Sequence, residues 1–196
     1  MARDLRSSVV ALVLATLVLG LGFPALMTGF AQATFSNKAD GSLIEVKGRV
    51  VGSRLAAQSF TRPAYFHERP SATTPAYNPA ATTFANLGPT SPDLAKAIRE
   101  RVKAILALER PYNPALTASE IPVDAVTTSG SGIDPDISPA YAALQSRRVA
   151  AVRHLSLAVV RRLITRNTDG RSLGFFGEPG VNVLELNLAL DRLGSS

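Results

Sequence analysis

The chain has 196 residues, enough for one domain and a membrane segment but too few for two large domains. It contains no cysteine, which excludes thiol catalysis and zinc sites built on cysteine. The net charge is +6, but the arginines alternate with apolar residues at helical spacing and have no aromatic-rich neighbour, so we expect no nucleic-acid partner.

The chain begins with an apolar segment long enough to cross a membrane. No charged residue lies between Arg6 and Lys38, and residues 9–30 are mainly Val, Leu, Ala and Phe. A helix needs about 20 apolar residues to span the hydrocarbon layer, and a helix satisfies its own backbone groups there. Residues 9–30 therefore predict one transmembrane helix, with Pro24 as a kink or as the start of its last turn.

The charges that flank this segment predict its orientation. Arg3 and Arg6 precede it, and no positive excess follows it. The positive-inside rule then places residues 1–8 in the cytoplasm, with residues 31–43 as a linker to an extracytoplasmic domain over residues 44–196.

A cleaved secretory signal is the alternative interpretation of this segment. Residues 31–33, Ala-Gln-Ala, resemble a small-residue cleavage site. The apolar run is longer than the roughly 7–15 residues of such signals, and the triplet lies inside the apolar tail, so a retained anchor is favoured. Both interpretations export the rest of the chain.

The exported part shows alternating β and helical patterns. Residues 44–55 are rich in Val with glycine breaks and predict β structure. Residues 61–92 carry repeated prolines and several aromatic residues, which indicates a long irregular loop that packs onto something. Ser91 and Pro92 then predict the start of a helix, which ends before Pro111.

The second half continues this mixture. Residues 121–128 predict a short strand that enters a Gly/Ser turn, and Ser138 opens a helical region to about Asn167. That region is one helix or two, and Ser156 is the expected cap of a second one. Residues 181–190 predict a buried strand with a possible helical turn after it. The expected fold is a single N-terminal transmembrane helix plus one mixed α+β extracytoplasmic domain.

No constellation in the sequence specifies an enzyme. The Ser/Gly run 129–132 lacks the lysine of a phosphate-binding loop, so we expect a tight turn. His67 has too few companions for a metal site, and we expect a His–Glu or Arg–carboxylate pair to order the Pro-rich loop. No acid–base pair is expected among Asp134, Asp136 and Asp169. A solvated basic face is expected from Arg147, Arg148, Arg153, Arg161, Arg162 and Arg166.

The order of short motifs along the chain is more informative than any one of them. The motifs are Tyr65-Phe66-His67-x-Arg69-Pro70, Asn86-Leu87-Gly88-Pro89, Ser129-Gly130-Ser131-Gly132-x-Asp134-Pro135, Gly177-Glu178-Pro179 and Val181-Asn182-Val183-Leu184-x-Leu186-Asn187. Behind a single N-terminal span, this series closely resembles the KdpC family of subunits of the Kdp-type potassium-transporting ATPase over nearly the whole chain. Glu68 departs from the glycine that is usual in that family.

The resemblance implies a non-catalytic accessory subunit of a bacterial inner-membrane potassium pump. Its partners would be a channel-like potassium-translocating subunit, a P-type ATPase subunit, a small peptide subunit and membrane lipid. The family is described as a catalytic chaperone that raises ATP affinity, and Gln145 matches the proposed nucleotide contact. No stably bound cofactor is implied, only ATP through the ATPase subunit. The motif residues expected to serve structure or partner contact are Tyr65, Phe66, His67, Arg69, Pro70, Asn86, Ser129, Gly130, Ser131, Gly132, Asp134, Pro135, Glu178, Asn182 and Asn187.

The predicted topology conflicts with direct contact to cytoplasmic ATP, because the membrane would separate them. We therefore expect the span to pack on the channel-like subunit and the domain to sit over its extracellular entrance. There the domain would stabilise assembly or guide potassium, with Asp124, Asp134 and Asp136 near the opening. The alternative is an independently acting exported binding or hydrolytic domain, cleaved from a signal peptide.

Overall fold

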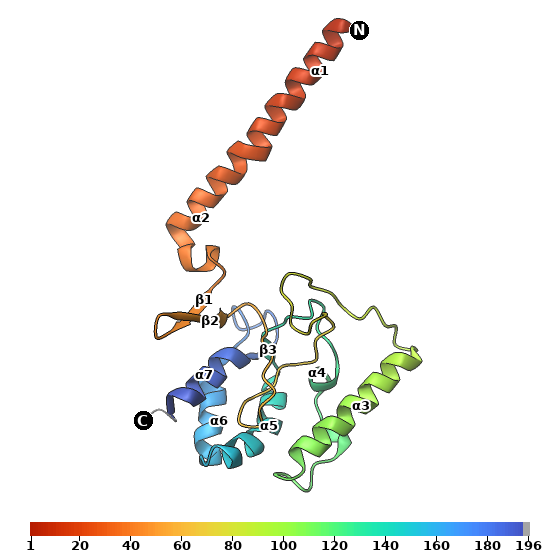
Figure 1. The fold of residues 1–196 in the computed structure, drawn as a ribbon, viewed down its shortest axis with the longest axis vertical. Coiled ribbons are helices and arrows are strands. Elements are labelled where there is room, and N and C mark those ends of the chain that lie inside the picture. The colour runs from red at the N-terminus through yellow and green to blue at the C-terminus, as the bar shows by residue number, and fades with distance from the viewer. Residues whose placement is uncertain (194–196) are drawn as a thin grey trace. The chain divides into compact units, whose positions relative to one another are not determined.

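The computed structural model describes residues 1–193 and divides the chain into two compact units, Met1–Val51 and the part from Gly52 onward. Each unit is described by itself below. Figure 1 labels the α-helices and strands β1, β2 and β3.

The first unit is a long apolar helix followed by a hairpin. Helix α1 (Ala2–Ala15), a π-helical stretch (Thr16–Gly22) and α2 (Phe23–Ala39) follow one another over 38 residues, with a kink at Phe35. None of these residues is buried in the unit. The helix is longer than the predicted span 9–30 and continues through most of the segment 31–43. By length and composition it is able to cross a membrane.

The helix continues through Pro24 without ending. Proline removes one backbone donor and crowds the preceding turn, and here the wider π-helical stretch lies directly before it. The expected last turn at Pro24 is therefore wrong, and the non-helical backbone lies later, at Phe35. Strands β1 (Leu43–Val46) and β2 (Arg49–Ser53) then pair through a turn at Lys47 and Gly48, both with positive φ.

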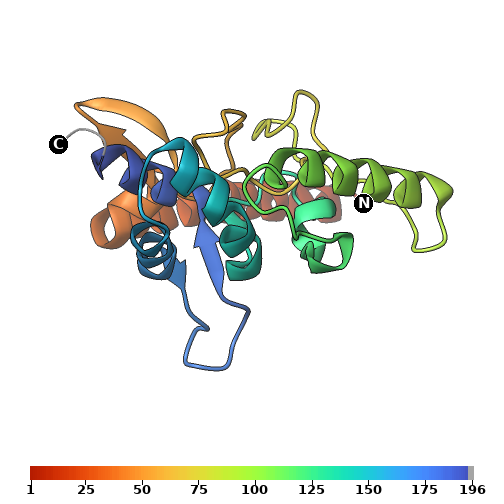
Figure 2. The same cartoon turned by 90° about the horizontal axis from the view of Figure 1, so that it is seen from below.

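The second unit is a helical domain with one small sheet. Its helices are α3 (Pro92–Glu109), α4 (Val123–Val126), α5 (Pro139–Val152), α6 (Leu157–Arg166) and α7 (Val183–Leu193), with a 3₁₀ turn at Ala118–Glu120. Strands β3 (Asp136–Ile137), β4 (Thr168–Asp169) and β5 (Gly180–Asn182) form an antiparallel sheet in the order β3-β5-β4. The prediction of one mixed helix and sheet domain after a single apolar helix is confirmed. Figure 2 shows the β4–β5 connection projecting from the domain.

Serine caps explain where three of these helices begin. The hydroxyl oxygens of Ser91, Ser138 and Ser156 each accept a hydrogen bond from the amide three residues later. The helical region 138–167 is therefore two helices. Between them, His154 takes a left-handed φ of 55° and the amide of Leu155 donates to the Ala150 carbonyl, which closes α5 as a Schellman motif.

Two predicted strands are helical in the structure. Residues 121–128 contain the short helix α4 instead of a strand. The predicted strand 181–190 is a strand only to Asn182, after which α7 begins. The apolar residues of α7 recur every three to four positions and are buried, and a short apolar run of this kind fits a buried helix as well as a buried strand.

The core of this domain lies between α5, α6, α7 and the sheet. Its fully buried members include Val149, Val160, Val181, Leu186 and Leu190. Phe66 adds its ring to this core from the irregular segment that connects β2 to α3. The Pro-rich loop is thus held by the core, as its aromatic residues predict.

Candidate functional site

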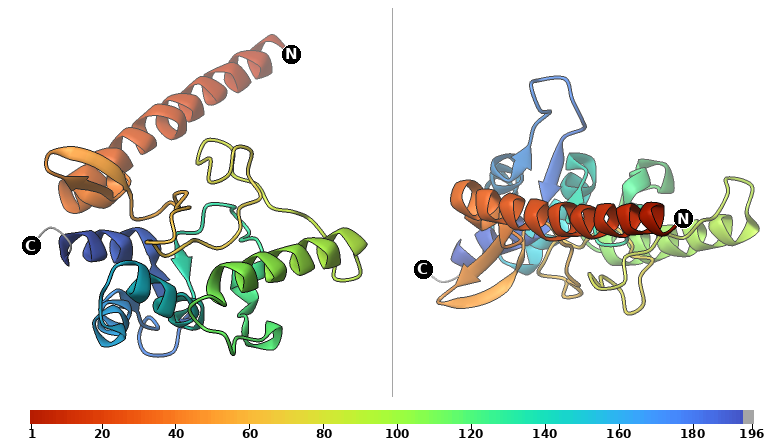
Figure 3. Two further views of the ribbon diagram at one scale, coloured as in Figure 1. Left: turned by 60° about the horizontal axis from the view of Figure 1, so that its bottom comes forward. Right: turned by 90° about the horizontal axis from the view of Figure 1, so that it is seen from above.

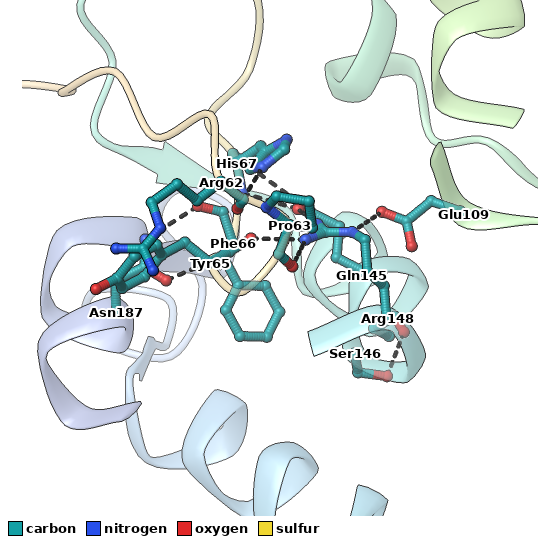
Figure 4. A network of polar contacts seen from close by, with 11 residues as sticks. Arg62, Pro63, Tyr65, Phe66, His67, Glu109, Gln145, Ser146, Arg148 and Asn187 are labelled. Atoms are coloured by element: carbon teal, nitrogen blue, oxygen red, sulfur yellow. Dashed lines mark hydrogen bonds and ion pairs between the residues drawn. The ribbon is translucent and has the colours of Figure 1, made fainter. Parts of the chain in front are cut away.

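A buried arginine organises the loop that carries the first sequence motif. Arg148 on α5 is fully buried, and its Nε donates to Glu109 Oε1 at 2.8 Å. Its Nη1 donates to the carbonyls of Pro63 and of Tyr65, the latter at 2.8 Å. Figure 4 shows these bonds meeting at one guanidinium group. The prediction that Arg148 belongs to a solvated basic face is therefore wrong.

The position of Arg148 follows from helical geometry. Tyr141, Gln145 and Val149 are buried at spacings of four residues along α5, and Arg148 lies on the same face. An arginine on a buried face needs a carboxylate and hydrogen-bond acceptors, because a buried charge without partners is very costly. The helical spacing indicates that Arg148 is buried. The sequence-based prediction placed it on a solvated face because arginine is rarely fully buried.

Two amide side chains hold the neighbouring loop residues as a paired strand would. Asn187 Oδ1 accepts from the Phe66 amide at 2.8 Å, and its Nδ2 donates to the Phe66 carbonyl at 3.0 Å. Gln145 does the same for His67, at 2.8 and 3.0 Å. Gln145 Oε1 also accepts from Arg148 Nη2 at 2.8 Å. The side-chain amides of Gln145 and Asn187 are thus both bonded within the domain.

A second arginine holds the start of this segment. Arg153 Nε donates to the Ala64 carbonyl at 2.6 Å, and its Nη2 forms an ion pair with Asp191 on α7 at 2.7 Å. The guanidinium carbon lies 4.6 Å from the centroid of the Tyr65 ring, and the Tyr65 hydroxyl donates to the same aspartate at 3.1 Å. Residues 63–67 are therefore fastened to both α5 and α7.

The charges of this network follow from its burial. Burial and the charge of Arg148 lower the pKa of His67, while the Arg62 carbonyl beside its Nε2 opposes that shift. Burial raises the pKa of Glu109, and the ion pair with Arg148 opposes that change. A neutral imidazole fits this location, since the nearby guanidinium is already a permanent positive charge.

Glu68 is buried without a good partner. It is 5% exposed, and neither carboxylate oxygen accepts a well-aligned hydrogen bond from the described residues. Burial raises the pKa of Glu68 well above its ordinary value, the nearby Gln58 amide opposes the shift, and the charges of Asp134 and Asp136 add to it. Of the two ion pairs expected for this loop, the Arg–carboxylate pair is present. It joins Arg69 Nη1 to Asp134 Oδ2 at 2.9 Å.

Glu68→Gln is expected to stabilise the domain at alkaline pH and to have little effect in acid. The folded state holds the Glu68 proton more tightly than the unfolded chain, whose carboxyl has an ordinary pKa of 4.5. The stability that this proton contributes is complete below that value and is lost as the pH rises toward the folded pKa. Urea unfolding at pH 4.5, 6 and 8, followed by tyrosine fluorescence, measures the difference between the variant and the parent.

Exposed Glu100 provides the matched control for this measurement. Glu100→Gln removes a carboxylate of the same type from the exposed surface of α3, so it should not reproduce the stabilisation expected from Glu68→Gln. If the gap between Glu68→Gln and the parent also stays constant from pH 4.5 to 8, the pKa of Glu68 is the same in the folded and the unfolded chain, and the prediction is wrong.

The Ser/Gly run is a tight turn, as predicted, against which the Pro-rich loop packs. The Ser129 hydroxyl accepts from the Gly132 amide at 2.9 Å, and the Ser71 hydroxyl donates to the Gly132 carbonyl at 2.6 Å. Gly132 has a φ of 73°, and a Cβ there would lie 2.7 Å from Thr73 Cγ2 and 2.8 Å from the Thr83 carbonyl oxygen. A side chain at position 132 would therefore separate the two loops.

Gly132→Ala is expected to destabilise the domain by about 2–3 kcal/mol, combining a left-handed backbone penalty of about 1 kcal/mol with displacement of a packed loop. The same substitution at Gly130 meets no atom within 4 Å and should change stability by about 0.5 kcal/mol or less. The difference between the two urea midpoints checks the prediction. Equal midpoints would show that the loop moves aside without cost.

The three aspartates that the sequence-based prediction grouped together line one cavity of about 540 Å³: Asp124, Asp134 and Asp136. Asp124 accepts from the amide and hydroxyl of Ser138, at 2.7 and 2.9 Å, and Asp134 pairs with Arg69. Burial raises the pKa of Asp136, the hydrogen bond from Asn182 Nδ2 opposes this, and other carboxylates add to it. Each carboxylate thus already has a partner in the chain.

The remaining motif residues are spread over the domain. Asn182 Oδ1 accepts from the Glu185 amide at the start of α7, and the Pro135 carbonyl accepts from the Val183 amide at 3.1 Å. Glu178 forms an exposed ion pair with Arg171, and Asn86 is exposed with a φ of 50°. Pro70 is half-buried, and Gly130 and Ser131 are exposed. The structure therefore brings together the 65–69, 129–134 and 182–187 motifs, and places Asn86 and Glu178 at the surface.

The network is suited to positioning a loop. Among residues 1–193, no group of three or more His, Asp or Glu side chains lies close enough to hold a metal ion. The arginines and amides described above are engaged with backbone carbonyls and amides of one segment. Such an arrangement fixes the position of the 63–67 segment.

Comparison with known proteins places this geometry in context. Residues 5–192 match the family model described as K+-transporting ATPase, c chain. A potassium-transporting ATPase KdpC subunit of Methylococcus capsulatus is 51% identical over 194 residues, covering 98% of this chain and all of that protein. A KdpC subunit of Sorangium cellulosum is 52% identical over 97% of this chain and 98% of its own length. One from Beijerinckia indica is 48% identical over 97% and 94%, respectively.

Proposed function

Because this chain belongs to the family of K+-transporting ATPase c chains and is an accessory subunit of the Kdp complex, we propose that it acts as an extracytoplasmic assembly subunit anchored by one helix. The observation that carries this proposal is the N-terminal helix Ala2–Ala39. It is strongly apolar, and none of its candidate spanning window is buried in the chain. Such a helix needs lipid or a partner helix to cover it.

The orientation rests on the charges at the two ends of the helix. Arg3 and Arg6 lie at its start, and the apolar stretch between Arg6 and Lys38 carries no charge. The positive-inside rule favours a cytoplasmic N-terminus and a domain on the other side of the membrane. Residues 9–30 then cross the bilayer, and residues 44–196 lie outside.

In this arrangement the domain would act on the channel-like potassium-translocating subunit. The helix would pack against that subunit, and the domain would sit over the extracellular entrance. The complex would also contain the P-type ATPase subunit and the small peptide subunit. The carboxylates of Asp124, Asp134 and Asp136 have partners within the chain, and the net charge is positive. These features support a stabilising role more than an electrostatic concentration of potassium.

We propose that this chain binds no cofactor stably and that ATP binds the ATPase subunit. The Gln145 amide is 1% exposed and bonded to His67 and Arg148. We therefore propose that Gln145 shapes the 63–67 loop. An effect on ATP affinity would then pass through assembly of the complex.

Single cysteines test the orientation cleanly, because the natural sequence contains none. In the assembled complex in spheroplasts, Ala158→Cys on the exposed side of α6 is expected to react with a membrane-impermeant maleimide. Ser8→Cys should react only after the membrane is permeabilised. The reverse pattern would place the domain in the cytoplasm and overturn the proposed role.

A further inference from the structure

A groove of about 720 Å³ runs along α3 and the turn after it. Figures 2 and 3 show α3 at the edge of the domain. The groove is lined by Arg99, Val102, Lys103, Leu106, Ala107, Arg110, Pro111 and Pro114. The lining residues on the helix follow each other at spacings of three and four, so they form one continuous stripe.

This stripe adjoins the face that packs on the domain, and Val102 also packs partly against the core. Ile105 and Glu109 are buried against the core. Val102 and Leu106, on the adjoining side, are only half-buried and form an apolar floor. Arg99 and Lys103 are exposed at the rim. The groove thus combines an apolar floor with a positively charged edge.

The rim cations have no acidic side chain within ion-pair distance among the described residues. Arg110 donates from Nε to the Leu116 carbonyl at 3.1 Å, which uses a neutral acceptor. In the described part of the chain, Arg99, Lys103 and Arg110 form no ion pair, and Lys96 one turn before Arg99 forms none either. No acidic residue lines the groove. These four cations lie within a narrow arc of the helix.

We propose that this groove docks an acidic segment of a partner subunit of the Kdp complex, with an apolar side chain of that segment on the Val102–Leu106 floor. The inference rests on the proposed function as an assembly subunit and adds the surface and the chemistry of its partner. Carboxylates of the segment would pair with Arg99, Lys103 and Arg110. Complementary charge on the rim guides association, and the apolar contact at the centre holds the bound state.

The shape of the groove favours a protein segment over a bilayer surface. A bilayer presents charged headgroups at its surface and keeps its apolar chains below them. It would meet the exposed cations Arg99 and Lys103 first, because Val102 and Leu106 are half-buried at the floor of the groove. A peptide segment with alternating acidic and apolar side chains reaches both, as amphipathic helices do in apolar grooves.

The test uses the full complex with charge reversal on the groove. Arg99→Glu with Lys103→Glu is expected to lower the amount of this chain retained on an affinity-tagged ATPase subunit at least fivefold at low salt. In the parent, retention should fall as NaCl rises, because screening weakens the rim pairs. Arg161→Glu with Arg162→Glu on α6 gives the same change in net charge at another exposed site and should leave retention unchanged.

Each other outcome has a defined meaning. If both double variants are retained like the parent, the groove does not dock a partner, while the assembly role stands. If the groove variant keeps its complex but loses sedimentation with phosphatidylglycerol vesicles, the surface binds lipid and the inference is wrong. If the parent itself is not retained, the proposed function as an assembly subunit is wrong, whatever the groove variants do. Tyrosine fluorescence unfolding of both variants verifies that each is folded.

Discussion

Replacing Arg148 by methionine is expected to destabilise the domain by about 3–5 kcal/mol, the cost of removing one member of a buried ion pair. The change leaves the Glu109 carboxylate without its cation and removes the donor to the carbonyls of Pro63 and Tyr65. The loop 63–67 should loosen from α5 as a result. Urea unfolding of the purified full-length chain in detergent measures this loss.

Tyrosine fluorescence is a selective probe for this experiment. The chain has four tyrosines and no tryptophan, and all four tyrosines follow Val51 in the sequence. The signal therefore reports on the domain and not on the apolar helix. A fluorescence transition with an unchanged slope would show that the loss comes from stability itself.

The neighbouring arginine is the matched control. Arg147 is exposed on the same helix, so Arg147→Met should change stability by about 0.5 kcal/mol or less. Adding Glu109→Leu to Arg148→Met should recover part of the loss, because the unpaired carboxylate is then gone. Equal stability of the two single methionine variants would contradict a structural role for the buried pair.

Gln145→Leu is expected to cost about 2–4 kcal/mol, because the amide and carbonyl of His67 both lose their partner in a buried site. The substitution is close in size and removes only the polar groups. If Gln145 shapes the loop, the ATP concentration for half-maximal activity of the assembled complex should stay within twofold of the parent. Lower activity should then follow the amount of complex that forms.

Asn187→Leu distinguishes this role from a nucleotide contact. Asn187 holds Phe66 in the same way as Gln145 holds His67, but it lies on α7 and is not the position matched to nucleotide contact. The two leucine variants should therefore lose similar stability and assembly. A large rise in the ATP requirement with Gln145→Leu alone would assign Gln145 to nucleotide binding.

Features that depend on a few consecutive residues could be predicted from the sequence. The caps at Ser91, Ser138 and Ser156 each act on an amide three residues away, so a short pattern contains the whole interaction. The apolar helix follows from its composition in the same way. The tight turn at residues 129–132 needed only the Ser/Gly run and the absence of a following lysine.

Features that join distant parts of the chain could not be predicted in this way. Arg148 finds Glu109 39 residues away, and Asn182 meets Asp136 across 46 residues. The helical spacing places Arg148 on the buried face of α5, but it does not identify Glu109 as the partner.

The boundary between β5 and α7 was not predicted, for a different reason. Residues 181–190 are apolar and β-branched at their start, which suits a strand, while their burial every three to four residues suits a helix. Tertiary contacts decide between these possibilities, because both periods bury the same short run. The change from strand to helix occurs at Asn182, whose Oδ1 accepts from the Glu185 amide in the first turn of α7.

The backbone groups of Phe66 and His67 form the paired hydrogen bonds of a β-strand, but their partners are the side-chain amides of Asn187 and Gln145. In an ordinary sheet, the register is fixed by two backbones, and a point substitution leaves the ladder in place. Here the register depends on the identities of Gln145 and Asn187, whose paired bonds hold Phe66 toward the core and His67 away from it. A slip of one residue would exchange an apolar ring for an imidazole in the core. The loop therefore has a sheet-like alignment that a single base change in its gene is able to erase.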